Sequence, residues 1–154
     1  MIKLVAIGNR FMKDDGIAIK VAEALENGFI HSNNIEVIIG ETDCQNCFYR
    51  LNHGDFVFIL DAMYKNSEPG SIHVIRLEEI IGQSSAVLMQ HDMSMIDLMR
   101  LYKSTFKGYL IGVEIGELGF GHELSPTLQE KFPQICCEVE GKIKKIILEE
   151  INDA

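Results

Sequence analysis

The fold is decided by residues 3–17, which read KLVAIGNRFMKDDGI. An apolar run of strand type ends at Gly8, and an acidic loop follows it. From Asp15 to Phe29, apolar residues recur every three to four positions, which is the spacing of an amphipathic helix. The order strand, loop, helix is the beginning of a βαβ unit, so this stretch predicts a sheet of parallel strands.

Further apolar runs along the chain repeat the pattern of the first one. They are rich in Val, Ile and Phe with little alternation, as expected for strands that are covered on both faces. A shorter run is predicted to lie nearer an edge of the sheet. The predicted central strands are Lys3–Gly8, Ile35–Gly40, Asp55–Asp61 and Tyr109–Glu114, and the shorter one is Ser71–Arg76.

Helical patterns lie between and after these strands. The second long one runs from about Met93 to Phe106, and the last begins after Ser125-Pro126, where Ser suits the cap and Pro the first helical position. Pro133 either kinks this last helix or restarts it. Strands that alternate with helices predict a three-layer α/β/α sandwich around a mostly parallel twisted sheet of about five strands. We expect residues 1–154 to form a single domain, because no repeat or linker interrupts them.

Composition and charge exclude several classes of function. The chain has 154 residues, 47% of them hydrophobic and 24% charged, which is ordinary usage for a globular protein. A net charge of −9 argues against general binding of nucleic acid. The apolar runs are too short to span a membrane, and the first is shorter than the core of a signal peptide. We therefore expect a cytoplasmic protein whose four cysteines are free thiols.

Three residues that can bind a metal are predicted to meet at one edge of the sheet. Asp15 follows the first strand, Asp61 ends the third, and His91 precedes the second long helix. In parallel sheets, ligands bind beyond the carboxyl ends of the strands. Two carboxylates and an imidazole can hold a divalent metal with open positions for water or substrate. Such a metal can polarise a peptide carbonyl or activate a water.

Each of these residues also has a purely structural interpretation. Asp14 and Asp15 can cap the following helix, where the helix dipole favours negative charge. Asp61 can be a hydrogen-bonded structural carboxylate, and His91 alone can be a surface residue. The convergence of all three residues at one edge favours the functional interpretation.

The order of short motifs resembles the family of hydrogenase maturation endopeptidases. Residues 8–17 are similar to the family signature G-N-x4-D-[DE]-G-[IVA]-G. Leu60-Asp61-Ala62, the histidine at 91, residues 111–114 and the segment from Gly119 to Pro126 match later motifs at family-like distances. The resemblance therefore extends along almost the whole chain.

This resemblance implies a function and a set of ligands. In that family the matching residues, Asp15, Asp61 and His91, bind the metal and carry catalysis. The implied protein is a monomer that removes a short C-terminal peptide from the precursor of a nickel–iron hydrogenase large subunit. The implied metal is nickel that is already inserted in the substrate. The alternative is a non-catalytic nickel-binding checkpoint or chaperone factor with the same ligands.

The chain departs from the family pattern in two places. Ala18 stands where the family has Gly, which keeps a small residue. After the second strand, residues 39–42 read IGET in place of Asp-Gly-Gly-[ST], so Glu41 and Asp43 are predicted to bring extra negative charge towards the site. If this loop positions the scissile peptide, its specificity differs here.

Other motifs give weaker alternatives. Cys44 and Cys47 form a C-x-x-C that can be redox-active or half a zinc site, but ordinary buried thiols are the simpler interpretation, and a soft nickel ligand is the remaining one. A flavodoxin-like phosphate binder is disfavoured by carboxylates at the first turn, which repel phosphate. A Ser or Cys hydrolase lacks a G-x-S-x-G elbow. We interpret the other histidines as surface residues, with His122 the nearest to a supporting role: His31, His53, His73 and His122.

Overall fold

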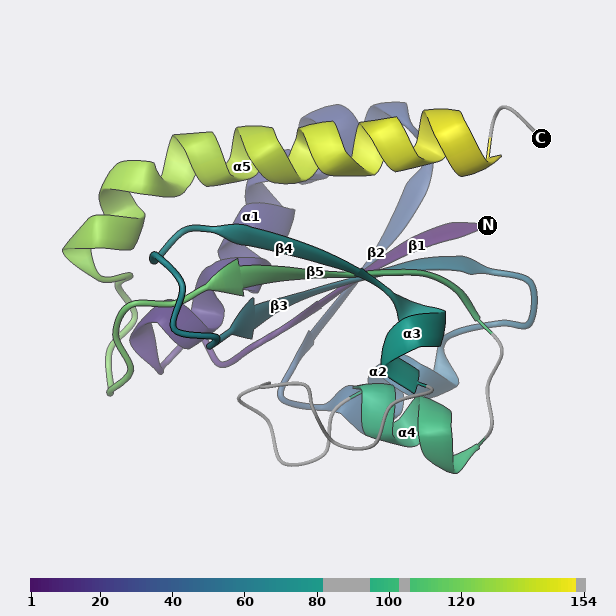
Figure 1. The fold of residues 1–154 in the computed structure, drawn as a ribbon, viewed down its shortest axis with the longest axis horizontal. Coiled ribbons are helices and arrows are strands. Elements are labelled where there is room, and N and C mark those ends of the chain that lie inside the picture. The colour runs from purple at the N-terminus through teal and green to yellow at the C-terminus, as the bar shows by residue number, and fades with distance from the viewer. Residues whose placement is uncertain (82–94, 103–105, 152–154) are drawn as a thin grey trace.

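The protein is a three-layer α/β/α sandwich around one five-stranded sheet (Figure 1). The computed structural model describes residues 1–81, 95–102 and 106–151. The spatial order of the strands is β2-β1-β3-β5-β4, in which all neighbours are parallel except the antiparallel edge strand β4. This confirms the predicted fold class. The strands are β1 Ile2–Ile7, β2 Ile35–Glu41, β3 Phe56–Met63, β4 Ile72–Arg76 and β5 Lys107–Glu114.

Helices cover both faces of this sheet. In Figure 1, α1 and α5 lie above the sheet, and α2, α3 and α4 lie below it. Within β1, Leu4 and Ala6 pack into the core on the α1 and α5 side, whereas Val5 and Ile7 pack into the core on the other side. The described α-helices are α1 Ile17–Leu25, α2 Cys44–Tyr49, α3 Leu77–Ile81, α4 Met95–Leu101 and α5 Pro126–Ile146, and shorter turns are η1 Lys13–Gly16, η2 Glu26–Ile30 and η3 Ile147–Ile151.

The predicted helices are found with changed bounds. The helix expected over 15–29 starts as the 3-10 turn η1, continues as α1 and widens into the π-helical turn η2, where Asn27 and Gly28 are poor helix formers. The helix expected over 93–106 is shorter, because α4 ends at Leu101 and Phe106 is not helical. The apolar spacing predicts Tyr102 on the packed side of this helix, but Tyr102 follows the end of α4 and is 54% exposed.

The last helix begins where the sequence predicts. Ser125 caps α5, since its Oγ accepts a hydrogen bond from the backbone N of Leu128 at 3.3 Å. The helix continues through Pro133 to Ile146, so the proline neither ends nor restarts it. No helix among the described residues is long and apolar enough to cross a membrane.

Candidate functional site

Asp15 lies at the carboxyl end of β1, on the turn η1. Its side chain is almost buried, and its Oδ2 accepts a hydrogen bond from the backbone N of Asn9 at 2.9 Å. The backbone of Gly8 packs closely against Asp15, so a side chain at position 8 would collide with the carbonyl oxygen of Asp15. Asn9 therefore holds Asp15 through its backbone amide.

Asp14 has a different role from its neighbour. It is fully buried, and its carboxylate accepts hydrogen bonds from the backbone N of Gly116 at 2.9 Å and Glu117 at 2.7 Å. It also accepts from the N and Oγ of Ser125 at 2.7 and 2.9 Å. Its position in the sequence suggested a cap for the following helix. The structure shows that Asp14 fastens the loop after β5 to the loop after β1.

Asp61 lies on β3, two residues before the strand ends at Met63. It is 1% exposed, and its Oδ1 accepts a hydrogen bond from the backbone N of Ala62 at 2.8 Å. Alternation along the strand directs it to the face of α2, as it does Ile59 and Met63. Because η1 packs against β3, Asp15 and Asp61 lie at the same edge of the sheet.

The structure thus places two of the three predicted ligands. His91 lies outside the described residues. Within residues 1–81, 95–102 and 106–151, no group of three or more His, Cys, Asp or Glu side chains is arranged to hold a metal ion. The assignment of Asp15, Asp61 and His91 as ligands stays a prediction. The two placed carboxylates supply the type of oxygen ligand that a divalent cation accepts.

The cysteines of the C-x-x-C lie on α2, a short helix that the sequence did not predict. Both are buried. Burial, with the negative charge of Asp61, raises the pKa of the Cys44 thiol to about 12, and burial likewise raises the pKa of Cys47. A thiol that stays protonated at neutral pH is a poor nucleophile and metal ligand. The structure therefore favours ordinary core thiols over a redox pair or half a zinc site.

The two acidic residues in the loop that departs from the family pattern each have a partner within the chain. The carboxylate of Glu41 accepts a hydrogen bond from Nε of Arg10 at 2.7 Å, so its charge is met by a guanidinium. Asp43 caps α2 by accepting from the backbone N of Asn46 at 3.0 Å. The extra negative charge expected near the site is therefore partly cancelled by Arg10, and Asp43 serves as a helix cap.

Glu114 and His73 form a polar pair that the sequence reading missed. Glu114 ends β5, is fully buried, and lies 3.1 Å from Nε2 of His73. Both oxygens of its carboxylate also accept from the backbone N of Lys65, at 3.1 and 2.9 Å. His73 is thus half-buried and paired, not a surface residue as expected. The sequence feature that could have identified Glu114 is the one used for Asp61, a carboxylate directly after a buried apolar run.

The remaining histidines agree better with the prediction. His31 and His53 are exposed. His122 is exposed too, and its ring lies 4.6 Å from the ring of Phe11 in an edge-on arrangement, beside the loop that carries Asp15.

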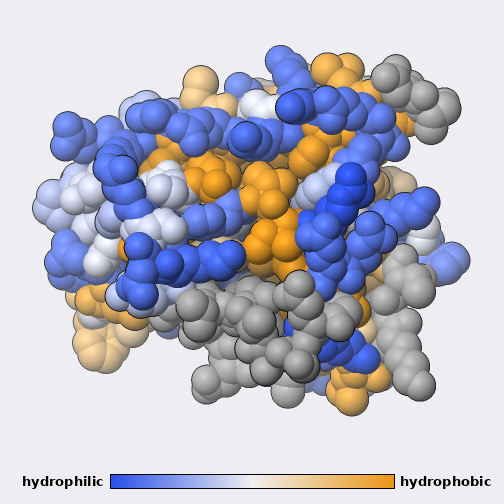
Figure 2. Space-filling view, viewed as in Figure 1, coloured by the Kyte–Doolittle hydropathy of each residue, from blue (hydrophilic) through white to orange (hydrophobic). Residues whose placement is uncertain are grey.

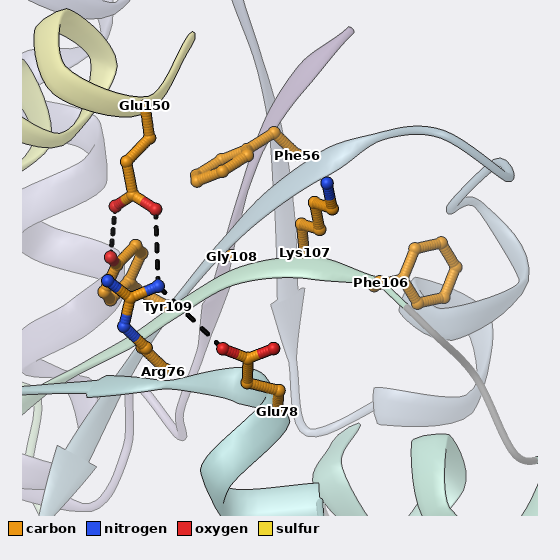
Figure 3. A pocket seen from close by; sticks show the side chains of 8 residues that line it. All are labelled: Phe56, Arg76, Glu78, Phe106, Lys107, Gly108, Tyr109 and Glu150. Atoms are coloured by element: carbon orange, nitrogen blue, oxygen red, sulfur yellow. Dashed lines mark hydrogen bonds and ion pairs between the residues drawn. The ribbon is translucent and has the colours of Figure 1, made fainter.

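A hollow lies at the end of the sheet opposite to Asp15 and Asp61, at the amino ends of β3 and β5 (Figure 3). It has a volume of about 320 Å3. Arg76 lies 3.4 Å from Glu150, 3.9 Å from Glu78 and 5.4 Å above the ring of Tyr109, whose hydroxyl also bonds to Glu150. These charged groups satisfy one another across the hollow, and it faces away from the edge where parallel sheets bind ligands. Its lining is Phe56, Arg76, Glu78, Phe106, Lys107, Gly108, Tyr109 and Glu150.

Known proteins resemble this chain in sequence and in fold. It is 26% identical over 133 residues to the hydrogenase 2 maturation protease of Escherichia coli (strain K12), covering 83% of this chain and 81% of that protein. The fold superposes on the hydrogenase maturating endopeptidase HybD from E. coli with a TM-score of 0.73 at 22% identity, over 94% of this chain and 92% of the other. For the [NiFe] hydrogenase maturation protease HybD from Thermococcus kodakarensis the TM-score is 0.69 at 26% identity, over 92% and 97%.

The sequence pattern of one family matches most of the chain. The match covers residues 19–142, so it includes Asp61 and begins after Asp15. The motif at residues 8–17 lies outside this match and is therefore independent support for the same family. With the fold and the placement of both carboxylates, this establishes that the chain belongs to the family of hydrogenase maturation proteases.

Proposed function

We propose that this protein is an endopeptidase that removes a short C-terminal peptide from the nickel-loaded precursor of a nickel–iron hydrogenase large subunit. The observation that carries the proposal is the pair of nearly buried carboxylates, Asp15 and Asp61, at the carboxyl edge of a sheet with this family's fold. The names of the relatives, which are proteases that mature hydrogenases, support the reaction.

In this proposal the metal belongs to the substrate. Asp15, Asp61 and His91 would bind nickel that the precursor carries, and so place the scissile peptide at the edge of the sheet. Nickel held there would supply a Lewis acid that can polarise a peptide carbonyl, and the attacking group would be water. Cleavage then occurs only after nickel insertion, because an empty precursor presents nothing for these residues to bind.

The compartment and the state of the chain belong to the same proposal. We place the reaction in the cytoplasm, for which the four free cysteine thiols are the support. We also propose that the protein acts as a monomer, as its resemblance to the family implies.

The test follows the mass of the nickel-loaded precursor during incubation with the purified protein. Loss of one C-terminal peptide is expected with nickel and not with the nickel-free precursor. Asp15→Asn, Asp61→Asn and His91→Ala should each abolish cleavage. Glu150→Gln is the matched control, because it removes a carboxylate at the opposite end of the sheet.

The alternative function gives a different result in the same experiment. A non-catalytic checkpoint or chaperone factor would bind the nickel-loaded precursor and leave its mass unchanged. Cleavage that persists in all three variants would reject the proposed ligands while leaving the protease function in place.

A further inference from the structure

Three large apolar side chains are exposed on two loops beside Asp15. Phe11 is 56% exposed, Leu118 is 51% exposed and Phe120 is 89% exposed. Apolar groups gather at the lower left of Figure 2, the corner at which Figure 1 places the loops after β1 and β5. We call these three residues the Phe120 surface. Exposed apolar groups that gather in this way are typical of protein-binding sites.

Backbone hydrogen bonds join the two loops that carry the Phe120 surface. The N of Gly121 donates to the carbonyl of Phe11 at 2.8 Å, and the N of Lys13 donates to the carbonyl of Gly121 at 2.9 Å. The buried carboxylate of Asp14 fastens the same two loops through its four hydrogen bonds. The backbone that carries the Phe120 surface is therefore fixed before a partner arrives, which lowers the entropic cost of ordering these loops on binding.

The turn around Phe120 is shaped by two glycines. Gly119 has a φ of 139° and Gly121 a φ of 149°, which are conformations that residues with a side chain rarely adopt. The chain thus uses glycine on both sides of one phenylalanine and holds that ring away from its own core. A loop with only a connecting role needs no large apolar residue at its tip.

Two cations near the Phe120 surface, Arg10 and Lys13, are paired with carboxylates of the same chain. Arg10 meets Glu23 at 2.8 Å and Glu41 at 2.7 Å. Lys13 lies 4.0 Å from Glu117. Exposed apolar groups next to paired charges are the composition of a protein interface, so the complementary partner surface is apolar.

We propose that the Phe120 surface is the docking site for the hydrogenase large-subunit precursor, an inference that rests on the proposed function. The argument is continuity: Phe11 and Asp15 share one loop, and Phe120 is joined to that loop by hydrogen bonds. A folded precursor whose C-terminal segment reaches Asp15 therefore covers these side chains. The matching feature of the precursor is an apolar recess next to the segment that carries the scissile bond.

The test compares Phe120→Ser with Leu148→Ser. Leu148 is the matched control, because it is 56% exposed on η3, at the other end of the molecule. With nickel-loaded precursor, Phe120→Ser should raise KM about tenfold or more with kcat unchanged, as the loss of a central apolar contact does. Leu148→Ser should leave both constants unchanged. Phe11→Ser, measured separately, should act as Phe120→Ser does.

Binding is measured in addition to cleavage. The Asp15→Asn variant and the Asp15→Asn/Phe120→Ser double variant are compared for affinity to the same precursor by calorimetry, and the double variant should bind about tenfold more weakly. Urea unfolding curves that match the wild type show that Phe120→Ser is folded. If that variant were unstable, Leu118→Ser would take its place.

The outcomes separate this inference from the proposed function. If wild type cleaves and Phe120→Ser has an unchanged KM and affinity, the docking site is rejected and the protease function stands. A fall in kcat with KM unchanged would also reject docking. If wild type binds through Phe120 without cleaving, docking holds and the checkpoint function replaces the protease. If Phe120→Ser changes only self-association of the protein, the occupant is a second copy and the inference is wrong.

Discussion

At the amino ends of β1 and β3, the carboxylate of Asp55 meets the ammonium of Lys3 at 2.8 Å, whereas at the carboxyl ends Asp14, Asp15 and Asp61 accept hydrogen bonds from backbone N–H groups. All of these side chains are buried or nearly so. An ion pair offsets the charge of a buried carboxylate, whereas N–H donors fix its orientation. The described contacts at the amino end therefore include an ion pair between side chains, and those at the carboxyl end orient three carboxylates.

The largest expected effect separates the two adjacent aspartates at the carboxyl end. Asp14→Ala should lower the free energy of unfolding by about 4 kcal/mol, because it leaves buried donors of Gly116, Glu117 and Ser125 without their acceptor. Asp15→Ala should cost about 1 kcal/mol. Urea unfolding measures both values, and equal losses would contradict the division of roles between the two residues.

Breaking the ion pair at the amino end should affect stability and spare the reaction. Lys3→Met leaves the carboxylate of Asp55 buried and should cost about 3 kcal/mol. Cleavage per folded molecule should stay at the wild-type rate. Lys3→Met/Asp55→Leu is the control, since replacing both partners removes the buried charge and should recover most of the loss.

The same ion pair predicts how stability depends on pH. Burial opposes ionisation of Asp55, but its hydrogen bonds with Lys3 and Asn52 outweigh burial and lower its pKa. Because the pKa is lower in the folded state, this stabilisation is present above the unfolded-state value of about 4 and is lost as the pH falls through the folded-state value. Between about pH 7 and about pH 3, the free energy of unfolding should therefore fall less for Lys3→Met/Asp55→Leu than for the wild type, as measured by urea unfolding at both pH values.

Replacing Glu114 tests whether its hydrogen bonds hold the segment between β3 and β4 in place, as those of Asp14 hold the two loops. Glu114→Gln keeps one oxygen acceptor for the N of Lys65 but weakens the contact with His73, so we expect a loss of about 1–2 kcal/mol. Amide hydrogen exchange at Lys65 should become faster. Unchanged exchange at Lys65, with unchanged stability, would mean that Glu114 does not hold the segment between β3 and β4.

The smallest effect is expected at the hollow in Figure 3. Burial, together with the hydrogen bond to Glu150, raises the pKa of Tyr109 to about 12. Glu150→Gln should lower this pKa towards the ordinary value near 10, while changing stability by less than about 1 kcal/mol because Arg76 is half-exposed. A spectrophotometric titration of the phenolate measures the shift, and Glu130→Gln serves as the control, because Glu130 is exposed on α5 and is not among the groups that shift the pKa of Tyr109. An unchanged titration curve would show that Glu150 does not raise the pKa of Tyr109.

The sequence predicted the strands and the long helices because their patterns are local. A buried strand such as β3 is a continuous apolar run, and the cap of α5 is written in Ser125-Pro126. The short helices α2 and α3 were missed, since six and five residues carry too little periodicity. α2 packs closely on β2, where a side chain on Gly40 would collide with Cys47.

The candidate site was predictable where a motif names a residue and unpredictable where partners come from elsewhere in the chain. Asp15 and Asp61 follow from their motifs and their positions at strand ends. The role of Asp14 depends on Ser125, which lies 111 positions away, and the role of Glu114 on His73, which lies 41 positions away. No local pattern records either contact.

The sequence by itself determined the fold class, the family and the positions of two carboxylates at strand ends. Only the tertiary structure decided the strand order β2-β1-β3-β5-β4, which charges pair with cations, and which apolar side chains stay exposed beside Asp15. Periodicity records which side chains leave water, and that is a local property of the chain. The partner of a charge depends on which distant segments meet in three dimensions, as when Lys3 reaches the carbonyl of Arg50 and the carboxylate of Asp55.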